Sequence, residues 1–226
     1  MKLYLDDCRM EKIQELFDLY PVDGVTSNPT VLKKCGRQPM EVLKEVRSFI
    51  GNDKMLMAQV ISTSAEDMIK EAHKIIEIIG TENYFVKIPA VPQGIKAIKA
   101  LSKEGIRTNA TGIYSVSQGL LAANAGAKAM APYISRIDNL GGNGLQVTKD
   151  LQDIINVNGY DVQIVPGSIK TAAQVLECAK YGIAGVAISA EVWEAFMKNP
   201  TVDKAIEVFN QDFESLVGTG KTFLNL

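Results

Sequence analysis

The stretch Tyr84-Phe85-Val86-Lys87-Ile88-Pro89 predicts a short apolar β-strand that carries one lysine. An unbroken apolar run without polar alternation is typical of a parallel strand that is buried on both faces. A lysine is out of place there, because burial disfavours the charged ammonium form of its side chain. A neutral lysine amine attacks carbonyl carbons and forms Schiff bases. The alternative is a structural lysine that reaches solvent from an edge strand.

Similar strand-like runs recur along the chain and alternate with helical patterns. The runs begin at Leu3, Gly24, Leu56, Tyr84, Arg107, Ala129, Gln163 and Gly185. The helical patterns cover Met10–Tyr20, Pro39–Ile50, Ala65–Ile79, Gly94–Lys103, Val116–Ala125, Leu145–Asn156, Thr171–Tyr181 and Glu191–Lys198. Eight strand–helix units within about 200 residues predict an α/β fold of the (β/α)8 TIM-barrel type. A doubly wound open sheet is the alternative, but no glycine-rich nucleotide fingerprint follows the first strand.

A further helix is expected after the eighth unit. Residues 1–199 are predicted to form the barrel, and residues 200–226 an additional helix and tail within a single domain overall. Pro200 opens the helix, whose apolar stripe consists of Val202, Ala205, Ile206, Phe209, Phe213 and Leu216. The predicted barrel is already closed by its eight units, so the stripe is expected to pack outside the barrel or on a neighbouring subunit.

Composition and charge narrow the possible functions. The formal net charge of -2 gives no basic footprint for a nucleic acid or a membrane surface. No apolar run reaches the roughly 18 residues that a membrane span needs. Cys8, Cys35 and Cys178 lack metal-ligand spacing, and the single histidine, His73, cannot build a histidine-rich metal site. We therefore expect a cytoplasmic protein that uses neither a metal nor a cofactor and binds neither nucleic acid nor membrane.

Polar side chains occur where the predicted strands end. In chain order they are Asp6, Thr26, Asn28, Gln59, Lys87, Asn109, Thr111, Tyr133, Arg136 and Ser168. The active site of a TIM barrel forms at the C-terminal ends of its strands. Polar groups from seven strands would therefore converge on one face, and this convergence favours Lys87 as the chemical centre.

These residue types suit Schiff-base chemistry on a sugar. Such chemistry needs an amine, a group that moves protons, and hydrogen bonds that fix a dihydroxyacetone unit. Lys87 supplies the amine, and Asp6 can orient it or carry its proton, unless Asp6 only caps the first helix. Asn28 can bond a carbinolamine hydroxyl, unless it is only a turn residue before Pro29.

The remaining candidates divide into proton-transfer and substrate-binding groups. Gln59, Thr111 and Tyr133 can hold the water or hydroxyl that exchanges a proton when the carbon–carbon bond breaks, although a tyrosine is often simply part of the core.

Arg136 and the turn at Ser168 suit a phosphate, because they combine a fixed cation with backbone N–H groups. An ion pair of Arg136 with Asp138 is the alternative. Thr26 and Asn109 are expected to contact the substrate.

Four blocks of sequence resemble the small transaldolases and fructose-6-phosphate aldolases, collinearly from Met1 to about Gln211. The blocks are Leu3-Tyr4-Leu5-Asp6, Gly24-Val25-Thr26-Ser27-Asn28-Pro29, Val86-Lys87-Ile88-Pro89 and Ala131-Pro132-Tyr133-Ile134-Ser135-Arg136-Ile137-Asp138. The resemblance implies a class I mechanism without metal. It assigns the Schiff base to Lys87, proton transfer to Asp6, the carbinolamine contact to Asn28, and phosphate binding to Arg136 and Ser168. It also implies a homodecamer of two five-membered rings, in which the C-terminal helix reaches over a neighbour.

Members of this family differ in the fate of the three-carbon enamine. Aldolases release it as dihydroxyacetone, whereas transaldolases of the pentose phosphate pathway hold it until an aldose such as erythrose 4-phosphate arrives. Gln59, Tyr133 and Ala131 resemble the aldolase type, while Asn109 resembles the transaldolase residue. We expect an aldolase that splits fructose 6-phosphate, with a transaldolase as the alternative. A barrel that binds sugar phosphates without catalysis is a third possibility.

Overall fold

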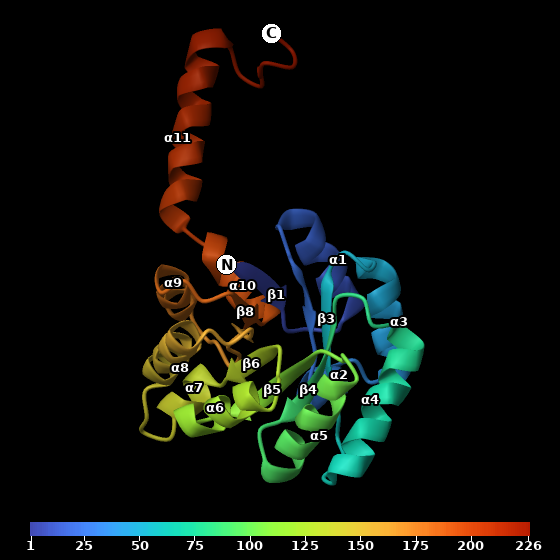
Figure 1. The fold of residues 1–226 in the computed structure, drawn as a ribbon. Coiled ribbons are helices and arrows are strands. Elements are labelled where there is room, and N and C mark those ends of the chain that lie inside the picture. The colour runs from blue at the N-terminus through green and yellow to red at the C-terminus, as the bar shows by residue number, and fades with distance from the viewer. The chain divides into compact units, whose positions relative to one another are not determined.

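The computed structural model describes residues 1–226, in which eight parallel strands form a nearly closed barrel (Figure 1). The strands are β1 (Lys2–Leu5), β2 (Gly24–Thr26), β3 (Met55–Gln59), β4 (Tyr84–Pro89), β5 (Thr108–Ile113), β6 (Ala129–Pro132), β7 (Gln163–Ile164) and β8 (Gly185–Ile188). They lie in the order β7-β6-β5-β4-β3-β2-β1-β8. The gap between β7 and β8 is bridged where Ala187 N–H donates to the oxygen of Pro166 at 2.9 Å. The predicted TIM barrel is confirmed.

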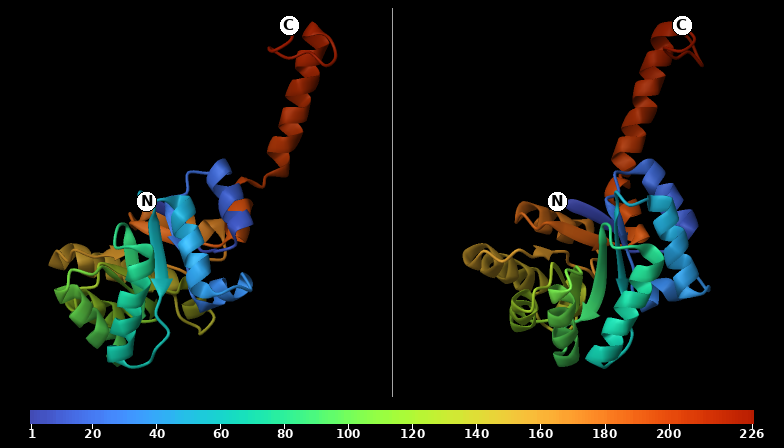
Figure 2. Two further views of the ribbon diagram at one scale, coloured as in Figure 1. Left: turned by 90° about the vertical axis from the view of Figure 1, so that its right-hand side faces the viewer. Right: turned by 45° about the vertical axis from the view of Figure 1, so that its right-hand side comes forward.

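Helices surround the strands, as the further views of Figure 2 also show. They are α1 (Met10–Leu19), α2 (Pro29–Lys34), α3 (Pro39–Ile50), α4 (Ala65–Ile79), α5 (Pro92–Lys103), α6 (Val116–Asn124), α7 (Ile134–Asp138), α8 (Gly144–Asn158), α9 (Ala172–Lys180) and α10 (Ala190–Met197). The two that the sequence did not predict, α2 and α7, have six and five residues. Helices this short are under two turns long, so they leave no readable apolar period.

Side-chain caps fix the starts of several helices. Ser64, Ser115 and Thr171 accept hydrogen bonds from backbone N–H groups in the first turns of α4, α6 and α9. Ser115 and Thr171 form full capping boxes with the glutamine three residues later. Each cap satisfies backbone donors that the helix itself leaves unpaired. The loops before these helices carry polar residues from the strand ends. Each loop is therefore fixed at one end by the strand and at the other by the helix cap.

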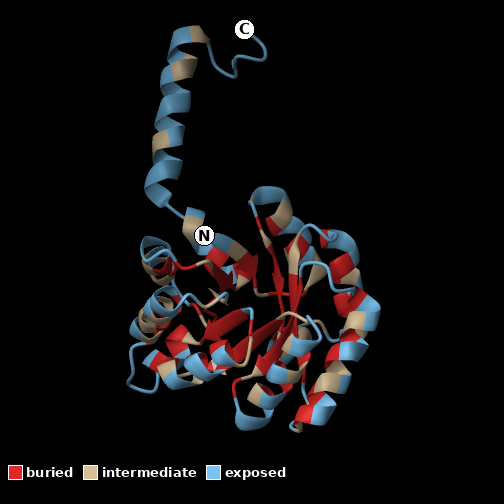
Figure 3. Cartoon of the chain, in the orientation of Figure 1, coloured by how far each residue is buried: buried red, intermediate tan, exposed pale blue.

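Buried residues concentrate on the strands (Figure 3). Tyr4, Met57, Phe85, Ala129 and Val165 form one apolar cluster contributed by four strands and the segment after β7. Side chains two residues apart on a strand face the same side of a sheet. The inward positions that follow this cluster and line one cavity are therefore Asp6, Lys87, Ala131 and Gly167, at the C-terminal ends of the strands.

The chain divides into two compact units, Met1–Trp193 and Glu194–Leu226. The second unit contains α11 (Pro200–Val217), so the expected extra helix exists. None of the residues of α11 is buried, and Val202, Ile206, Phe209 and Leu216 expose their apolar side chains. After α11 the tail folds back, with the rings of Phe213 and Phe223 4.9 Å apart. Packing of α11 on a neighbouring subunit stays a prediction.

Candidate active site

Lys87 lies inside the barrel near the end of β4. Its side chain is buried, and its Nζ donates a hydrogen bond to the backbone oxygen of Ser27 at 2.9 Å. β4 pairs with β3 on one side and β5 on the other, so the edge-strand alternative is wrong. A buried amine at the C-terminal end of the barrel interior is the arrangement that the sequence predicted.

Asp6, Thr26 and Asn28 form a hydrogen-bonded group beside this amine. Thr26 Oγ1 donates to Asp6 Oδ1 at 2.7 Å, and Asn28 Nδ2 lies 3.5 Å from Asp6 Oδ2. Asp6 does not cap the first helix, because Arg9 is the N-cap of α1. Asn28 does cap a helix: its Oδ1 accepts from Val31 N–H at 3.0 Å at the start of α2. Capping fixes the Asn28 amide so that its N–H donors face Asp6.

Tyr133 follows β6, and its hydroxyl lies 2.9 Å from Thr111 Oγ1 of β5. The tyrosine is half-buried, and the Arg136 guanidinium stacks over its ring with 4.8 Å between the guanidinium carbon and the ring centroid. Tyr133 is therefore not simply a core residue. Its hydroxyl can pass a proton to or from Thr111 or a bound water.

Arg136 lies on α7 and is exposed. The expected alternative, an ion pair with Asp138, is wrong: the Asp138 carboxylate accepts from Gly144 N–H at 2.8 Å and from Gln174 Nε2 at 3.4 Å. Ser168 has a φ of 55°, which few residues other than glycine adopt. Backbone strain of this kind is often found at functional sites.

Asn109 is buried on β5 and keeps unused hydrogen-bonding capacity. Its Nδ2 contacts the sulfur of Met57 at 2.9 Å, and its Oδ1 has no hydrogen-bond partner. A buried amide oxygen without a partner costs free energy, of the order of 1–3 kcal/mol. A substrate hydroxyl that donates to Asn109 would remove this cost.

A cavity of about 340 Å³ joins most of these groups. It is lined by eight of the ten predicted site residues, Asp6, Thr26, Asn28, Lys87, Asn109, Tyr133, Arg136 and Ser168. Thr111 is linked to it through the Tyr133 hydroxyl. Further polar residues that the sequence did not predict also line it: Thr30, Lys34, Ser135, Asn139, Lys170, Ser189 and Glu191. Lys34 lies on the unpredicted α2, and Ser189 and Glu191 follow β8, the one strand whose end carried no predicted site residue.

Gln59 is the exception among the predicted residues. It is next to Lys87 in the β3–β4 ladder, yet it lines a separate, mainly apolar cavity of about 540 Å³ beside α2, α3 and α4. Its Oε1 atom is buried without a hydrogen-bond partner. The larger cavity does not include Lys87, so its size does not make it the catalytic cavity.

The chain contains no group of three or more His, Cys, Asp or Glu side chains that could hold a metal ion. None of the helices has both the length and the apolar content required to span a membrane.

Comparison with known proteins identifies the family. The family described as Transaldolase/Fructose-6-phosphate aldolase matches residues 3–223. A protein of Lactiplantibacillus plantarum named probable transaldolase is 39% identical over 221 residues, which cover 98% of this chain and 100% of that protein. This chain belongs to the transaldolase/fructose-6-phosphate aldolase family. The resemblance inferred from four sequence blocks is thereby confirmed, and the chain is an enzyme of this type.

Solved structures of more distant proteins share the barrel of this family member. The 3-hexulose-6-phosphate synthase of Salmonella typhimurium matches with a TM-score of 0.63 at 17% identity, over 86% of this chain and 92% of that one. A structure described as native KDPGal matches with a TM-score of 0.59 at 12% identity, over 82% and 81% of the two chains. At such low identity these likenesses concern the fold alone.

Proposed function

We propose that this member of the family is a class I aldolase that cleaves fructose 6-phosphate, or forms it, at the C3–C4 bond. The products of cleavage are dihydroxyacetone and glyceraldehyde 3-phosphate. The observation that carries the proposal is the buried Lys87 amine, which shares one cavity with the Asp6 carboxylate, the Tyr133 hydroxyl and the Arg136 cation. Amine, proton carrier and anion site are the groups that this reaction needs.

The reaction begins when the Lys87 amine attacks the C2 carbonyl and forms a carbinolamine. Asn28 donates a hydrogen bond to the new hydroxyl, and Asp6 supplies the proton with which it leaves as water. In the resulting iminium ion the positive nitrogen withdraws electrons from C3. The Asp6 carboxylate left by that transfer then takes the proton of the C4 hydroxyl, the C3–C4 bond breaks to give the aldehyde, and its electron pair becomes the enamine.

The fate of the enamine separates the two activities of the family. Tyr133 with Thr111 can protonate C3 of the enamine through their linked hydroxyls, after which water releases dihydroxyacetone and free Lys87. The 2.9 Å contact between the two hydroxyls supports this aldolase route. Gln59 supports it less than the sequence alone suggested, because it lines the other cavity.

The second candidate is a transaldolase. It is favoured by Asn109, which lines the cavity and whose amide oxygen has no hydrogen-bond partner, so that it can accept from a hydroxyl of the retained three-carbon unit. The 39% identical relative is also named as a probable transaldolase. In that case sedoheptulose 7-phosphate and glyceraldehyde 3-phosphate would yield erythrose 4-phosphate and fructose 6-phosphate.

The test is release of glyceraldehyde 3-phosphate from fructose 6-phosphate, with and without erythrose 4-phosphate. Sustained turnover without the acceptor supports the aldolase. Turnover only with the acceptor supports the transaldolase and overturns the first candidate. No turnover in either case, together with no ketose trapped on the protein by borohydride, would contradict both.

We also propose a cytoplasmic homo-oligomer, which by the family resemblance is a decamer. The support is the exposed apolar stripe of α11, which needs a partner surface, and the three free cysteines, which suit a reducing compartment.

A further inference from the structure

Charges are distributed unevenly around the cavity. Arg136 and Lys170 lie on its β6–β7 side, and Lys34 of α2 lies on its β2 side. Apart from Asp6, the only carboxylate that lines the cavity is Glu191, which follows β8. Because β8, β1 and β2 are neighbours in the barrel, Glu191 and Lys34 belong to the same side.

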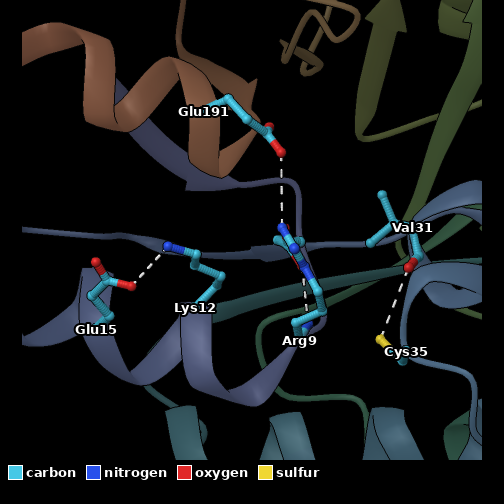
Figure 4. A network of polar contacts seen from close by, with 7 residues as sticks. Arg9, Lys12, Glu15, Val31, Cys35 and Glu191 are labelled. Atoms are coloured by element: carbon cyan, nitrogen blue, oxygen red, sulfur yellow. Dashed lines mark hydrogen bonds and ion pairs between the residues drawn. The ribbon is translucent and has the colours of Figure 1, made fainter.

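Glu191 is held in place by a chain of charged groups (Figure 4). Arg9 Nη2 lies 3.8 Å from Glu191 Oε1. Arg9 in turn is fixed by Asp7, a fully buried carboxylate, through hydrogen bonds of 3.1 Å from Nε and 2.6 Å from Nη2. A hydrogen bond from the Ser189 side chain, a backbone N–H and the charges of Lys34 and Arg9 lower the pKa of Glu191. The Glu191 carboxylate is therefore ionised at neutral pH.

Lys34 differs from Asp7, Arg9 and Glu191, which are linked to one another by ion pairs. It has no ion-pair partner within 4 Å, but its charge lowers the pKa of both Asp7 and Glu191. By reciprocity, these two carboxylates offset the field of Lys34. On the opposite side, Arg136 and Lys170 have no carboxylate of this kind beside them in the cavity wall.

We propose that Glu191 is a specificity-determining residue that neutralises Lys34, so that only the β6–β7 side of the cavity attracts a phosphate. A sugar phosphate is thereby directed toward Arg136 and Lys170, with its carbonyl carbon toward Lys87. The inference rests on the proposed function, because it assumes a phosphorylated substrate. Arg9 acts through Glu191 as a positioning residue.

The first test measures inorganic phosphate binding by titration calorimetry. Glu191→Gln removes the charge but keeps the shape, and it is expected to tighten phosphate binding about threefold to tenfold or to add a second site. Lys34→Ala in the Glu191→Gln background is expected to restore the wild-type isotherm. Lys33→Ala is the matched control, because Lys33 lies on the same helix but lines the other cavity.

The second test compares acceptors with and without phosphate. In Glu191→Gln, erythrose 4-phosphate is expected to inhibit at high concentration by binding in the wrong orientation, whereas unphosphorylated erythrose does not. An unchanged phosphate isotherm, or a change that survives loss of Lys34, would overturn the inference. The proposed function fails separately if borohydride traps no ketose on the wild type. It also fails if the Arg136→Ala variant binds phosphate like the wild type.

Discussion

At the scale of single residues, Lys87 carries the strongest prediction. Lys87→Met keeps an unbranched, apolar side chain of similar length in the buried position, so the barrel should fold while the amine is lost. Borohydride reduction with fructose 6-phosphate is expected to add a ketose-derived mass to the wild type and none to the variant. Lys99→Met, on an exposed part of α5, is the control and should trap like the wild type. Trapping that survives in Lys87→Met would place the Schiff base on another lysine.

The hydroxyl pair of Tyr133 and Thr111 has a separable role. Tyr133→Phe and Thr111→Val each remove one hydroxyl, and each is expected to lower kcat for cleavage of fructose 6-phosphate about 10- to 1000-fold. Borohydride trapping should persist, because formation of the Schiff base does not need this pair. Single-turnover mixing followed by trapping distinguishes the two steps. Equal loss of trapping and turnover would show that the pair acts before bond cleavage.

Asp7 is predicted to make stability depend on pH. Burial opposes its ionisation, but the hydrogen bonds from Arg9 outweigh that cost, so its pKa in the folded protein lies below the usual value. The stabilisation of the folded protein by the ionised Asp7 carboxylate is therefore fully present above the unfolded-state pKa of about 4. It is lost as the pH falls through the lower folded-state pKa. Asp7→Asn should lower the free energy of unfolding by about 1–3 kcal/mol at pH 7. The difference in this free energy between wild type and variant should shrink toward pH 3. Urea unfolding at several pH values measures it, with the exposed Asp18→Asn as control.

At the scale of elements, the contact between β4 and α5 positions the catalytic lysine. A Cβ atom on Gly94 would lie 1.8 Å from the backbone oxygen of Pro89, the last residue of β4. Gly94→Ala must therefore push α5 away from the strand that carries Lys87, and it is expected to cost about 1–3 kcal/mol and to lower kcat. Urea unfolding checks the stability. Lys96→Ala, on the exposed face of the same helix, should change neither quantity.

At the scale of the whole molecule, the apolar stripe of α11 is predicted to form a subunit contact. Its exposed Ile206 and Phe209 are expected to be buried by another copy of the chain. If the homodecamer implied by the family resemblance forms, light scattering should give the wild type a mass of about ten times the 24.6 kDa of one chain. The double substitution Ile206→Asp and Phe209→Asp should yield smaller species, whereas Asn210→Asp should not. A wild-type mass of one chain would refute the expected assembly.

The sequence by itself determined the barrel, the extra helix and most of the cavity. Apolar runs and helical periods are local patterns, and eight repetitions of them leave little choice of fold. Lys87, Asp6 and Asn109 were predictable because polar residues at the ends of parallel strands must meet at one face. The short helices α2 and α7 were not predictable, since five or six residues define no period.

Only the tertiary structure decided which side chains share a cavity. It assigned Gln59 to the apolar cavity although Gln59 is next to Lys87 in the ladder. It also brought Glu191 close to Arg9 and within the electrostatic influence of Lys34, because pairing of β8 with β1 joins the two ends of the barrel. Contacts across a closed sheet depend on side-chain direction and on residues far apart in the chain. No local pattern records either of these.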